Sequence, residues 1–309
     1  MSDTFILVLF IVVVLVMLAL DLGVFQKRPH FPSMKEAAIW TAVWFLLAML
    51  FCLFIWLNQG SGKAFEYLTG YLVEEALSVD NVFVFIVILT YFAVPKEVHH
   101  AVLFWGVLSA IVFRAVFILL GSALVTQFHW ILYLLGAFLI VTAVKLAIQR
   151  DTQVDPERNP LIRLARRFFP VTREYAGKKF FVRTGGKRSM TPLFLVLLTI
   201  ETTDIAFATD SIPAIFAITR DAFIIFTSNI FAVLGLRSLY FLVAGFMGQF
   251  RFLKYGLSAV LAFIGAKMLL ERWVQVPIHV SLLIIFFLLS VAIVASLLRP
   301  EKNASAVKP

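Results

Sequence analysis

The amino-acid sequence predicts an all-α polytopic membrane protein, with about nine transmembrane helices that include an inverted repeat of two three-helix units. Three observations predict this class. The chain has 309 residues, of which 61% are apolar and only 15% are charged. Apolar runs of about 20 residues, the length of a helix that crosses a bilayer, fill most of the sequence. Acidic and basic residues also recur in the same order in two parts of the chain.

Nine stretches are long and apolar enough to cross a membrane, and they make the chain, 1–309, a single membrane domain. Two leading spans are expected to be scaffold, three form a first repeat, a basic loop follows, three more form a second repeat, and one span ends the domain. The scaffold, 4–57, holds spans 4–25 and 36–57; repeat 1, 67–149, holds 67–92, 98–125 and 128–149; the loop is 150–190; repeat 2, 191–271, holds 191–219, 222–247 and 253–271; the final span is 277–298.

The repeat is recognised by charges at matching places in three successive spans. Because each unit holds three spans, the second unit must enter the membrane from the opposite side, an arrangement found in many secondary transporters. Chance similarity between apolar helices explains the apolar matches, but not the shared order of acid, Arg and Lys. The alignment pairs Glu74 with Asp204, Asp80 with Asp210, Asn81 with Ser211, Arg114 with Arg237, and Lys145 with Lys267.

The loop charges predict the orientation. With the N-terminus outside, the loops expected inside hold 20 Lys and Arg and those outside hold three. The positive-inside rule therefore places the N-terminus outside and the C-terminus in the cytoplasm, and we expect a bacterial cytoplasmic (inner) membrane. The net charge of +9 then requires no nucleic acid partner. Membrane lipid is the expected partner, and segment 161–169, LIRLARRFF, fits either an amphipathic surface helix or a basic topogenic loop.

Two clusters of three carboxylates lie inside the expected spans. An unpaired carboxylate in the middle of a bilayer costs about 3 kcal/mol or more, so it normally faces a protein interior, a cation or a water path. Helical spacing places Ser78 and Asn81 on the same face as Glu74, and Ser211 on the same face as Glu201 and Asp204, with Asp80 and Asp210 offset by about 120°. The first cluster is Glu74, Glu75 and Asp80, and the second is Glu201, Asp204 and Asp210.

Bent or broken helices would bring the acids of both clusters to one centre. Pro213 cannot donate to the carbonyl of Thr209, so we expect a break in the second copy and infer one in the first. Buried pairing with Arg114 or Arg237 is the alternative role for individual acids, but two arginines cannot neutralise six carboxylates.

The candidate ligands are carboxylates, amides, hydroxyls and carbonyls, which suit a hard divalent cation such as Mg²⁺, Ca²⁺ or Mn²⁺. The five histidines lie in loops or at span ends, and the chain has one cysteine, so a zinc or copper site is disfavoured. Anions are disfavoured because acids outnumber bases within the spans. No cofactor is expected to be bound permanently.

The stretches EEALSVDNVFVF, IETTDIAFATDSIPAIF and SNIFAVLGLRSLYF strongly resemble the TerC family, named for tellurium resistance, and its Alx-type members in particular, over about 4–300. The resemblance implies an integral membrane protein that exports manganese, with the motif residues in the ion path. On this sequence the implied metal ligands are Glu74, Asp80, Asn81, Glu201, Asp204, Asp210 and Ser211, with Glu75, Ser78, Arg114 and Arg237 in support.

The sequence therefore predicts a transporter, not an enzyme, that exports Mn²⁺ from the cytoplasm, with proton antiport as the coupling hypothesis. Two other classes stay open. One is a membrane scaffold or tellurite-resistance protein without transport. The other is an intramembrane aspartyl protease, which also uses two acids on separate helices, although its GxGD signature is absent from the sequence. Protein partners are not predicted.

Overall fold

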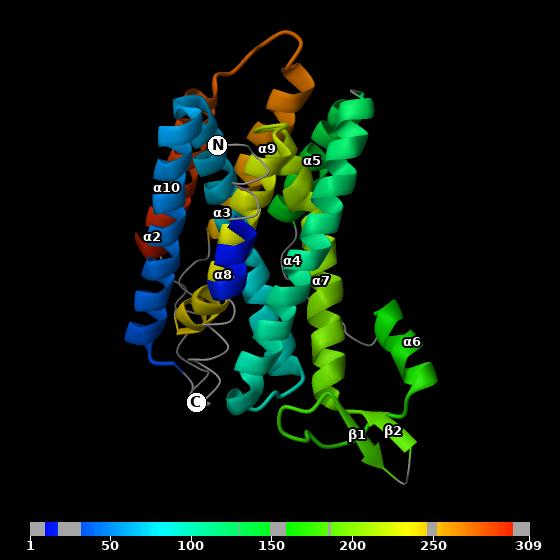
Figure 1. Ribbon diagram of the computed structural model, residues 1–309. Coiled ribbons are helices and arrows are strands. Elements are labelled where there is room, and N and C mark those ends of the chain that lie inside the picture. Colours follow the sequence, from blue (N-terminus) through cyan, green and yellow to red (C-terminus); the bar gives the residue numbers. More distant parts are fainter. Residues whose placement is uncertain are drawn as a thin grey trace.

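The computed structural model describes residues 10–17, 32–128, 130–148, 159–184, 187–245 and 252–298. They form a bundle of long helices with a small β-hairpin at one end (Figure 1). The hairpin pairs β1 with β2 in antiparallel register, Phe181 opposite Met190. The elements are α2 (Met34–Gln59), α3 (Ser61–Tyr91), α4 (Lys96–Gln127), α5 (Ile131–Ile148), α6 (Pro160–Phe168), β1 (Phe181–Thr184), β2 (Lys187–Met190), α7 (Pro192–Phe216), α8 (Ala222–Gly245), α9 (Leu253–Leu270) and α10 (Ile278–Leu298).

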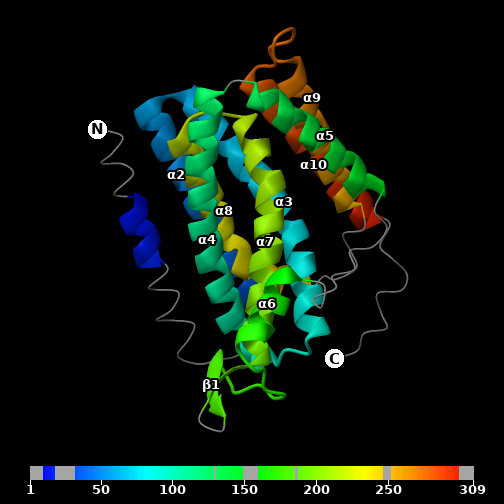
Figure 2. The same cartoon turned by 90° about the vertical axis from the view of Figure 1, so that its right-hand side faces the viewer.

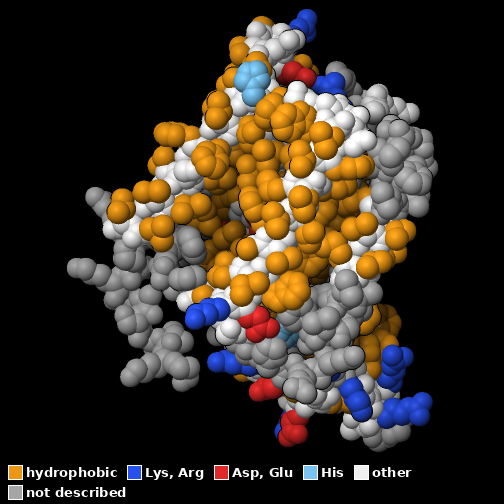
Figure 3. All heavy atoms as spheres, turned by 60° about the vertical axis from the view of Figure 1, so that its left-hand side comes forward, with side chains coloured by type: hydrophobic (Ala, Val, Ile, Leu, Met, Phe, Trp, Pro, Cys, Tyr) orange, Lys and Arg blue, Asp and Glu red, His pale blue; other side chains and the backbone are white. Residues whose placement is uncertain are grey.

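The predicted class, a helical integral membrane protein, is confirmed. Among the described residues, seven helices are long and apolar enough to span a membrane: α2, α4, α5 and α7 to α10. Helix α3 has the length but carries Glu74, Glu75 and Asp80. Of the first expected span, 4–25, only 10–17 is described, and it is helical. Figure 3 shows a broad apolar band on one face, with charged side chains gathered towards its two ends, as a protein surrounded by lipid requires.

The helices pack with the pairing that an inverted repeat predicts. Helix α3 packs on α8, and its counterpart α7 packs on α4; each helix of the first unit also contacts its own counterpart, α3 with α7, α4 with α8 and α5 with α9. Helix α3 runs towards the hairpin end and α7 runs away from it (Figures 1 and 2). The two three-helix units therefore lie in opposite orientations.

Small residues let α5 and α9 approach closely, as in many membrane helix pairs. A Cβ on Gly265 would lie 2.8 Å from the carbonyl oxygen of Gly136. At the other end of the same contact, Ser258 donates to the carbonyl of Ala143 at 2.6 Å. At the sequence offset that pairs Lys145 with Lys267, Gly136 corresponds to Ser258 and Ala143 to Gly265. The two contacts are thus copies of one another, related by the repeat.

The expected helix break is not observed. Helix α7 is continuous from Pro192 to Phe216 and α3 from Ser61 to Tyr91. Pro213 lies in the last turn of α7, where the loss of one hydrogen bond ends a helix rather than dividing it. The helix ends three residues later, at Phe216, and Ala217 donates to the carbonyl of Pro213 at 3.2 Å. With both helices unbroken, the six motif acids stay spread along two straight elements.

Candidate ion pathway

The motif residues gather in two places instead of one centre. Glu74 and Asp204 meet at the middle of the bundle, whereas Asp80 and Asp210 line a cavity. The cause is helical geometry. Six residues on a continuous helix separate the members of each pair by about 9 Å along the axis and about 120° around it. Because α3 and α7 run in opposite directions, Asp80 is displaced towards the hairpin end and Asp210 towards the other end.

The central cluster joins four helices through one arginine. Arg114 of α4 donates through Nη1 to Glu74 of α3, and also to the amide oxygen of Asn229 of α8 at 3.0 Å. Its Nη2 lies 3.5 Å from Asp204 of α7. The Asn229 amide nitrogen in turn donates to Glu74 Oε2 at 3.0 Å. These four side chains are almost completely buried, so the cluster fixes α3, α4, α7 and α8 to one another.

The cluster carries an unequal charge. Arg114 supplies one positive charge and the two carboxylates supply two negative charges, so one formal negative charge stays unbalanced. Asp204 Oδ2 is buried and has no hydrogen-bond partner among the described residues. A buried charge of this kind is costly unless it is paired. The centre is therefore suited to a proton or a cation in addition to Arg114.

Glu201 lies apart from both groups. Its Oε1 accepts a hydrogen bond from the Ser109 hydroxyl of α4, and its Oε2 is buried without a partner among the described residues. One residue further along α7, the Thr202 hydroxyl accepts a hydrogen bond from the Asn159 amide at 2.6 Å. Glu201 is thus placed on the hairpin side of the central cluster, beside the start of α6.

Residues from both copies of the motif line one cavity. Its volume is about 440 Å³, and it takes Asp80 and Asn81 from α3 and Asp210 and Ser211 from α7. The Thr142 hydroxyl of α5 donates to Asp210 at 3.1 Å. The Ser211 hydroxyl is buried and has no partner among the described residues. Thr209, whose carbonyl Pro213 leaves without its helical donor, and Lys145 line the same cavity.

This donor set can hold a hard cation only with help from neutral oxygens. In the described part of the chain, no group of three or more His, Cys, Asp and Glu side chains is close enough to hold a metal ion. Asp80 is followed by Asn81 and Asp210 by Ser211, and each of these two residues offers a neutral oxygen. Ions such as Mg²⁺ keep several waters when few carboxylates bind them. The arrangement fits a series of weak oxygen sites along a path better than one closed site.

Three of the expected supporting residues lie away from the cavity. Glu75 faces an apolar cavity of about 340 Å³ between α3, α8 and α10, with Tyr71 as its hydrogen-bond partner. Arg237 lines a small cavity with His100, Trp40 and Ser238 at the hairpin end of α8. Arg114 and Arg237 therefore occupy matching positions in sequence but do different work. Ser78, the third, is buried on α3 between Glu74 and Asn81.

Sequence reasoning missed three polar residues that the structure adds: Ser109, Thr142 and Asn229. Each stands within an apolar span, and Asn229 belongs to the stretch SNIFAVLGLRSLYF. A polar side chain inside a membrane helix is itself a signal of a buried partner. That signal identifies candidates, but it does not reveal which acid each one binds.

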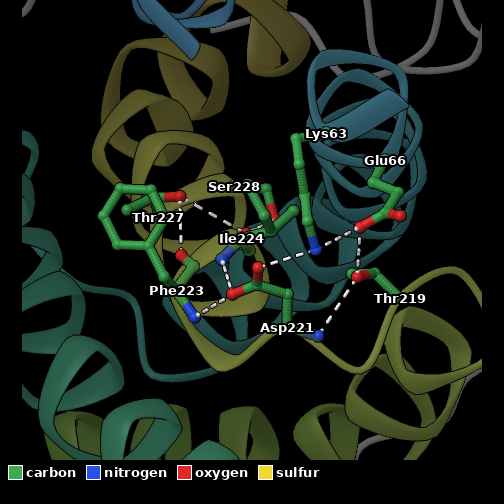
Figure 4. Close-up of polar contacts among 8 residues, drawn as sticks. All are labelled: Lys63, Glu66, Thr219, Asp221, Phe223, Ile224, Thr227 and Ser228. Atoms are coloured by element: carbon green, nitrogen blue, oxygen red, sulfur yellow. Dashed lines mark hydrogen bonds and ion pairs between the residues drawn. The ribbon is translucent and has the colours of Figure 1, made fainter. Parts of the chain in front are cut away.

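A second polar region closes the end of the bundle opposite the hairpin (Figure 4). Lys63 at the start of α3 bonds to Asp221 at 2.7 Å and to Glu66 at 3.3 Å. Thr219, in the turn before α8, donates to Glu66 at 2.5 Å. These contacts join the first unit to the second beside a cavity of about 590 Å³, which extends to Phe216, Lys267 and Glu271. Phe216 is six residues beyond Asp210 on α7, so this cavity lies further along α7 than the cavity lined by Asp80 and Asp210.

Comparison with known proteins identifies a family and several relatives. The sequence profile of the integral membrane protein TerC family matches residues 59–304. The chain is 49% identical to membrane protein STKORF319 of Myxococcus xanthus over 303 residues, which covers 97% of this chain and 95% of the relative. It is 47% identical over 289 residues to Alx of Escherichia coli K12, named as a proposed membrane-bound redox modulator, covering 91% and 90% of the two chains. A membrane protein of Rickettsia bellii is 40% identical over 292 residues, covering 94% and 97%. No solved structure matches the chain.

Proposed function

The chain belongs to the TerC family of integral membrane proteins, and from that premise we propose that it exports a divalent cation, Mn²⁺ first, from the cytoplasm in exchange for protons. The cavity between α3 and α7 carries the proposal. It receives a carboxylate and a neutral oxygen donor from each of the two inverted units. Secondary transporters commonly place their ion sites where such units meet, near the middle of the membrane.

The donor chemistry supports the choice of ion. Carboxylate, amide and hydroxyl oxygens are ligands for Mg²⁺, Ca²⁺ and Mn²⁺, whereas softer metals favour thiolate and imidazole. The lining of the cavity contains neither Cys nor His. The preference for Mn²⁺ among the hard cations comes from the family resemblance of the two acidic motifs.

The order of the acids suggests a direction. The positive-inside rule makes the basic hairpin end cytoplasmic. A cation entering from that end would meet Asp80 first and leave by way of Asp210, at the other end of the same cavity. Beyond Asp210 it would reach the cavity bounded by Glu66, Asp221 and Glu271.

Export of this kind requires an energy source. Moving two positive charges outward against an inside-negative potential costs about 2.3 kcal/mol per charge per 100 mV. The sequence has no GxxxxGK[ST] phosphate-binding loop. Because metal ligands must lose their protons to bind, an acid that alternates between proton and cation would couple export to proton entry. Asp210, held by Thr142, is well placed for that role.

The name carried by the Alx relatives points to redox modulation. In this chain the only cysteine is Cys52, so it has no second thiol with which to form an internal disulfide. We therefore propose that any effect on redox state follows from cellular metal content, not from thiol exchange within the chain.

The test is Mn²⁺ uptake into inside-out vesicles with an imposed proton gradient. We expect uptake to need the gradient and to dissipate it, and Asp80→Asn and Asp210→Asn to abolish both effects. The matched control is Glu174→Gln, an exposed acid in the cytoplasmic loop, which should leave transport unchanged. Uptake that neither needs nor dissipates the gradient refutes coupling. An unchanged phenotype in both Asp variants favours a scaffold without transport.

A further inference from the structure

Helix α6 has a face buried against the protein, an exposed apolar face and exposed arginines. Ile162 is buried against Met190 and Leu195 of the hairpin and α7. A second face carries Leu161, Leu164 and Phe168, which are 39%, 51% and 68% exposed. At about 100° per residue, these three residues lie together. Two of the three exposed arginines lie on the opposite side, and the third lies at the edge of the apolar face. Those arginines are Arg163, Arg166 and Arg167.

The position of α6 along α7 places it at membrane depth. The Asn159 side chain accepts from the backbone of Leu161 at 2.9 Å, which caps α6, and donates to Thr202 at 2.6 Å. Thr202 lies ten residues beyond Pro192, or about 15 Å along α7. The first turns of α7 are apolar, PLFLVLLTI. Figures 1 and 2 show α6 beside this part of α7, above the hairpin.

A helix in that place contacts lipid unless another protein covers it. Three large apolar side chains would be exposed to water unfavourably. The membrane-spanning helices beside α6 would contact acyl chains, and the same chains can cover these three residues. Arginines on the opposite face would meet phospholipid headgroups, as would Arg183 and Arg188, which pair in the hairpin. Positive charge near a leaflet rich in anionic lipid is attracted to it, by about 1 kcal/mol per Lys or Arg.

We propose that α6 lies in the cytoplasmic leaflet as an interfacial helix, with Leu161, Leu164 and Phe168 among the acyl chains and its arginines bound to anionic phospholipid headgroups. The proposal concerns a site outside the ion path and does not depend on which ion is carried. It gives the basic loop a role in binding lipid, in addition to setting the orientation. Asn159 also ties this helix to α7 next to Glu201.

The experiment uses a fluorescent label on single cysteines in the full-length protein. In a Cys52→Ser background, Leu164→Cys carries the label on the proposed lipid face. Arg166→Cys is the matched control on the opposite face of α6, and Glu174→Cys is the control in the loop. Each protein is reconstituted in phosphatidylcholine vesicles, with or without an equimolar amount of phosphatidylglycerol. Quenching by nitroxide-labelled acyl chains is then compared with quenching by aqueous iodide.

We expect the label at 164 to be quenched by the nitroxide lipid and protected from iodide, and the label at 174 to show the reverse. Added phosphatidylglycerol should strengthen the lipid quenching at 164, and Arg163→Gln with Arg166→Gln should abolish that increase. Iodide quenching at 164 equal to that at 174 overturns the proposal, because α6 would then lie in water. Protection from both quenchers also overturns it, because a protein surface would then cover the helix. Mn²⁺ transport measured on the same vesicles reports separately on the proposed function.

Discussion

Arg114 donates to Glu74 at the point where α3, α4, α7 and α8 meet, and the same guanidinium reaches Asp204. One residue from each of the two aligned acidic motifs is therefore bound by a single base. The pairing explains how two carboxylates are tolerated inside a membrane bundle, and it separates them from the acids that remain available to an ion in the cavity.

We expect Arg114→Gln to destabilise the protein strongly. The arginine side chain is 0% exposed, and removing one partner of a buried ion pair typically costs about 3–5 kcal/mol, because a buried charge is left unpaired. Thermal unfolding of the detergent-solubilised protein measures the effect. The control is Arg220→Gln, whose pair with Glu271 is exposed by 41% and 52% on its two sides; an exposed pair contributes about 0–1 kcal/mol. Equal shifts in the unfolding temperature of the two variants would show that the central cluster contributes little to stability.

We expect Thr142→Val to weaken transport without destroying it. The change removes the hydroxyl that donates to Asp210 at 3.1 Å while keeping the shape of the side chain. The loss of such a hydrogen bond is worth about 1 kcal/mol, which corresponds to about a fivefold rise in the KM for Mn²⁺. Thr126→Val is the control, since that hydroxyl bonds to carbonyls of its own helix at 2.8 and 3.0 Å. An equal change in KM for both variants would contradict a role for Thr142 at the ion path.

These contacts show how far the sequence leads. Apolar runs predict the helices, because each must satisfy its own backbone in lipid; the expected span 222–247 is α8, Ala222–Gly245. The matched charges predict two inverted three-helix units, and the packing of α3 on α8 and of α7 on α4 has the symmetry of such a repeat. The spacing does not predict which acids bind Arg114 and which line the cavity, because that depends on which helices face one another. Lys145 illustrates the limit: the repeat alignment pairs it with Lys267, but only the structure shows that it is exposed and lines the cavity.

We expect Tyr175→Phe to loosen the loop between α6 and β1. The Tyr175 hydroxyl donates to the carbonyl of Phe92, in the turn between α3 and α4, at 2.7 Å. Its loss should cost about 1 kcal/mol and speed tryptic cleavage of the loop about fivefold where local opening limits cleavage. Tyr91→Phe, at an exposed neighbouring position, is the control.

The pH dependence of that effect follows from the pKa of Tyr175. Burial raises this pKa above its ordinary value, which is about 10. A raised pKa in the folded protein means that the stabilisation is complete below the unfolded value and is lost only as the pH rises through the folded one. The difference between wild type and Tyr175→Phe should therefore be constant across neutral pH. A difference that disappears near neutral pH would contradict this account.

We expect Lys63 and Asp221 to be coupled weakly, and the coupling to fall with added salt. Their 2.7 Å contact joins the two units at the end opposite the hairpin, and the side chains are 36% and 29% exposed. Such a pair contributes about 0.2–1 kcal/mol and is screened by salt. A double-mutant cycle of Lys63→Met and Asp221→Asn measures it. Asparagine keeps the cap that Asp221 makes with Phe223 at 3.0 Å, since Asn and Asp cap helices equally well. Coupling that does not change with salt would contradict this account, because it would mean that the pair is shielded from solvent.

Gly265→Ala should destabilise the α5–α9 contact even though alanine is the better helix former. The added methyl group would lie 2.8 Å from the carbonyl oxygen of Gly136 and 3.1 Å from Leu139 Cβ. Backbone cannot move aside as a flexible side chain can, so α5 and α9 must separate, at about 1–3 kcal/mol for an overpacked contact. Gly62→Ala is the matched control: nothing lies within 4 Å of its added methyl group, and the helix preference of about 1 kcal/mol should leave that variant as stable as wild type or slightly more so. Thermal unfolding in detergent distinguishes the two. If Gly265→Ala were as stable as Gly62→Ala, the close approach of α5 and α9 would not be needed for the fold, and the copied contact between Ala143 and Ser258 would have to hold the pair alone.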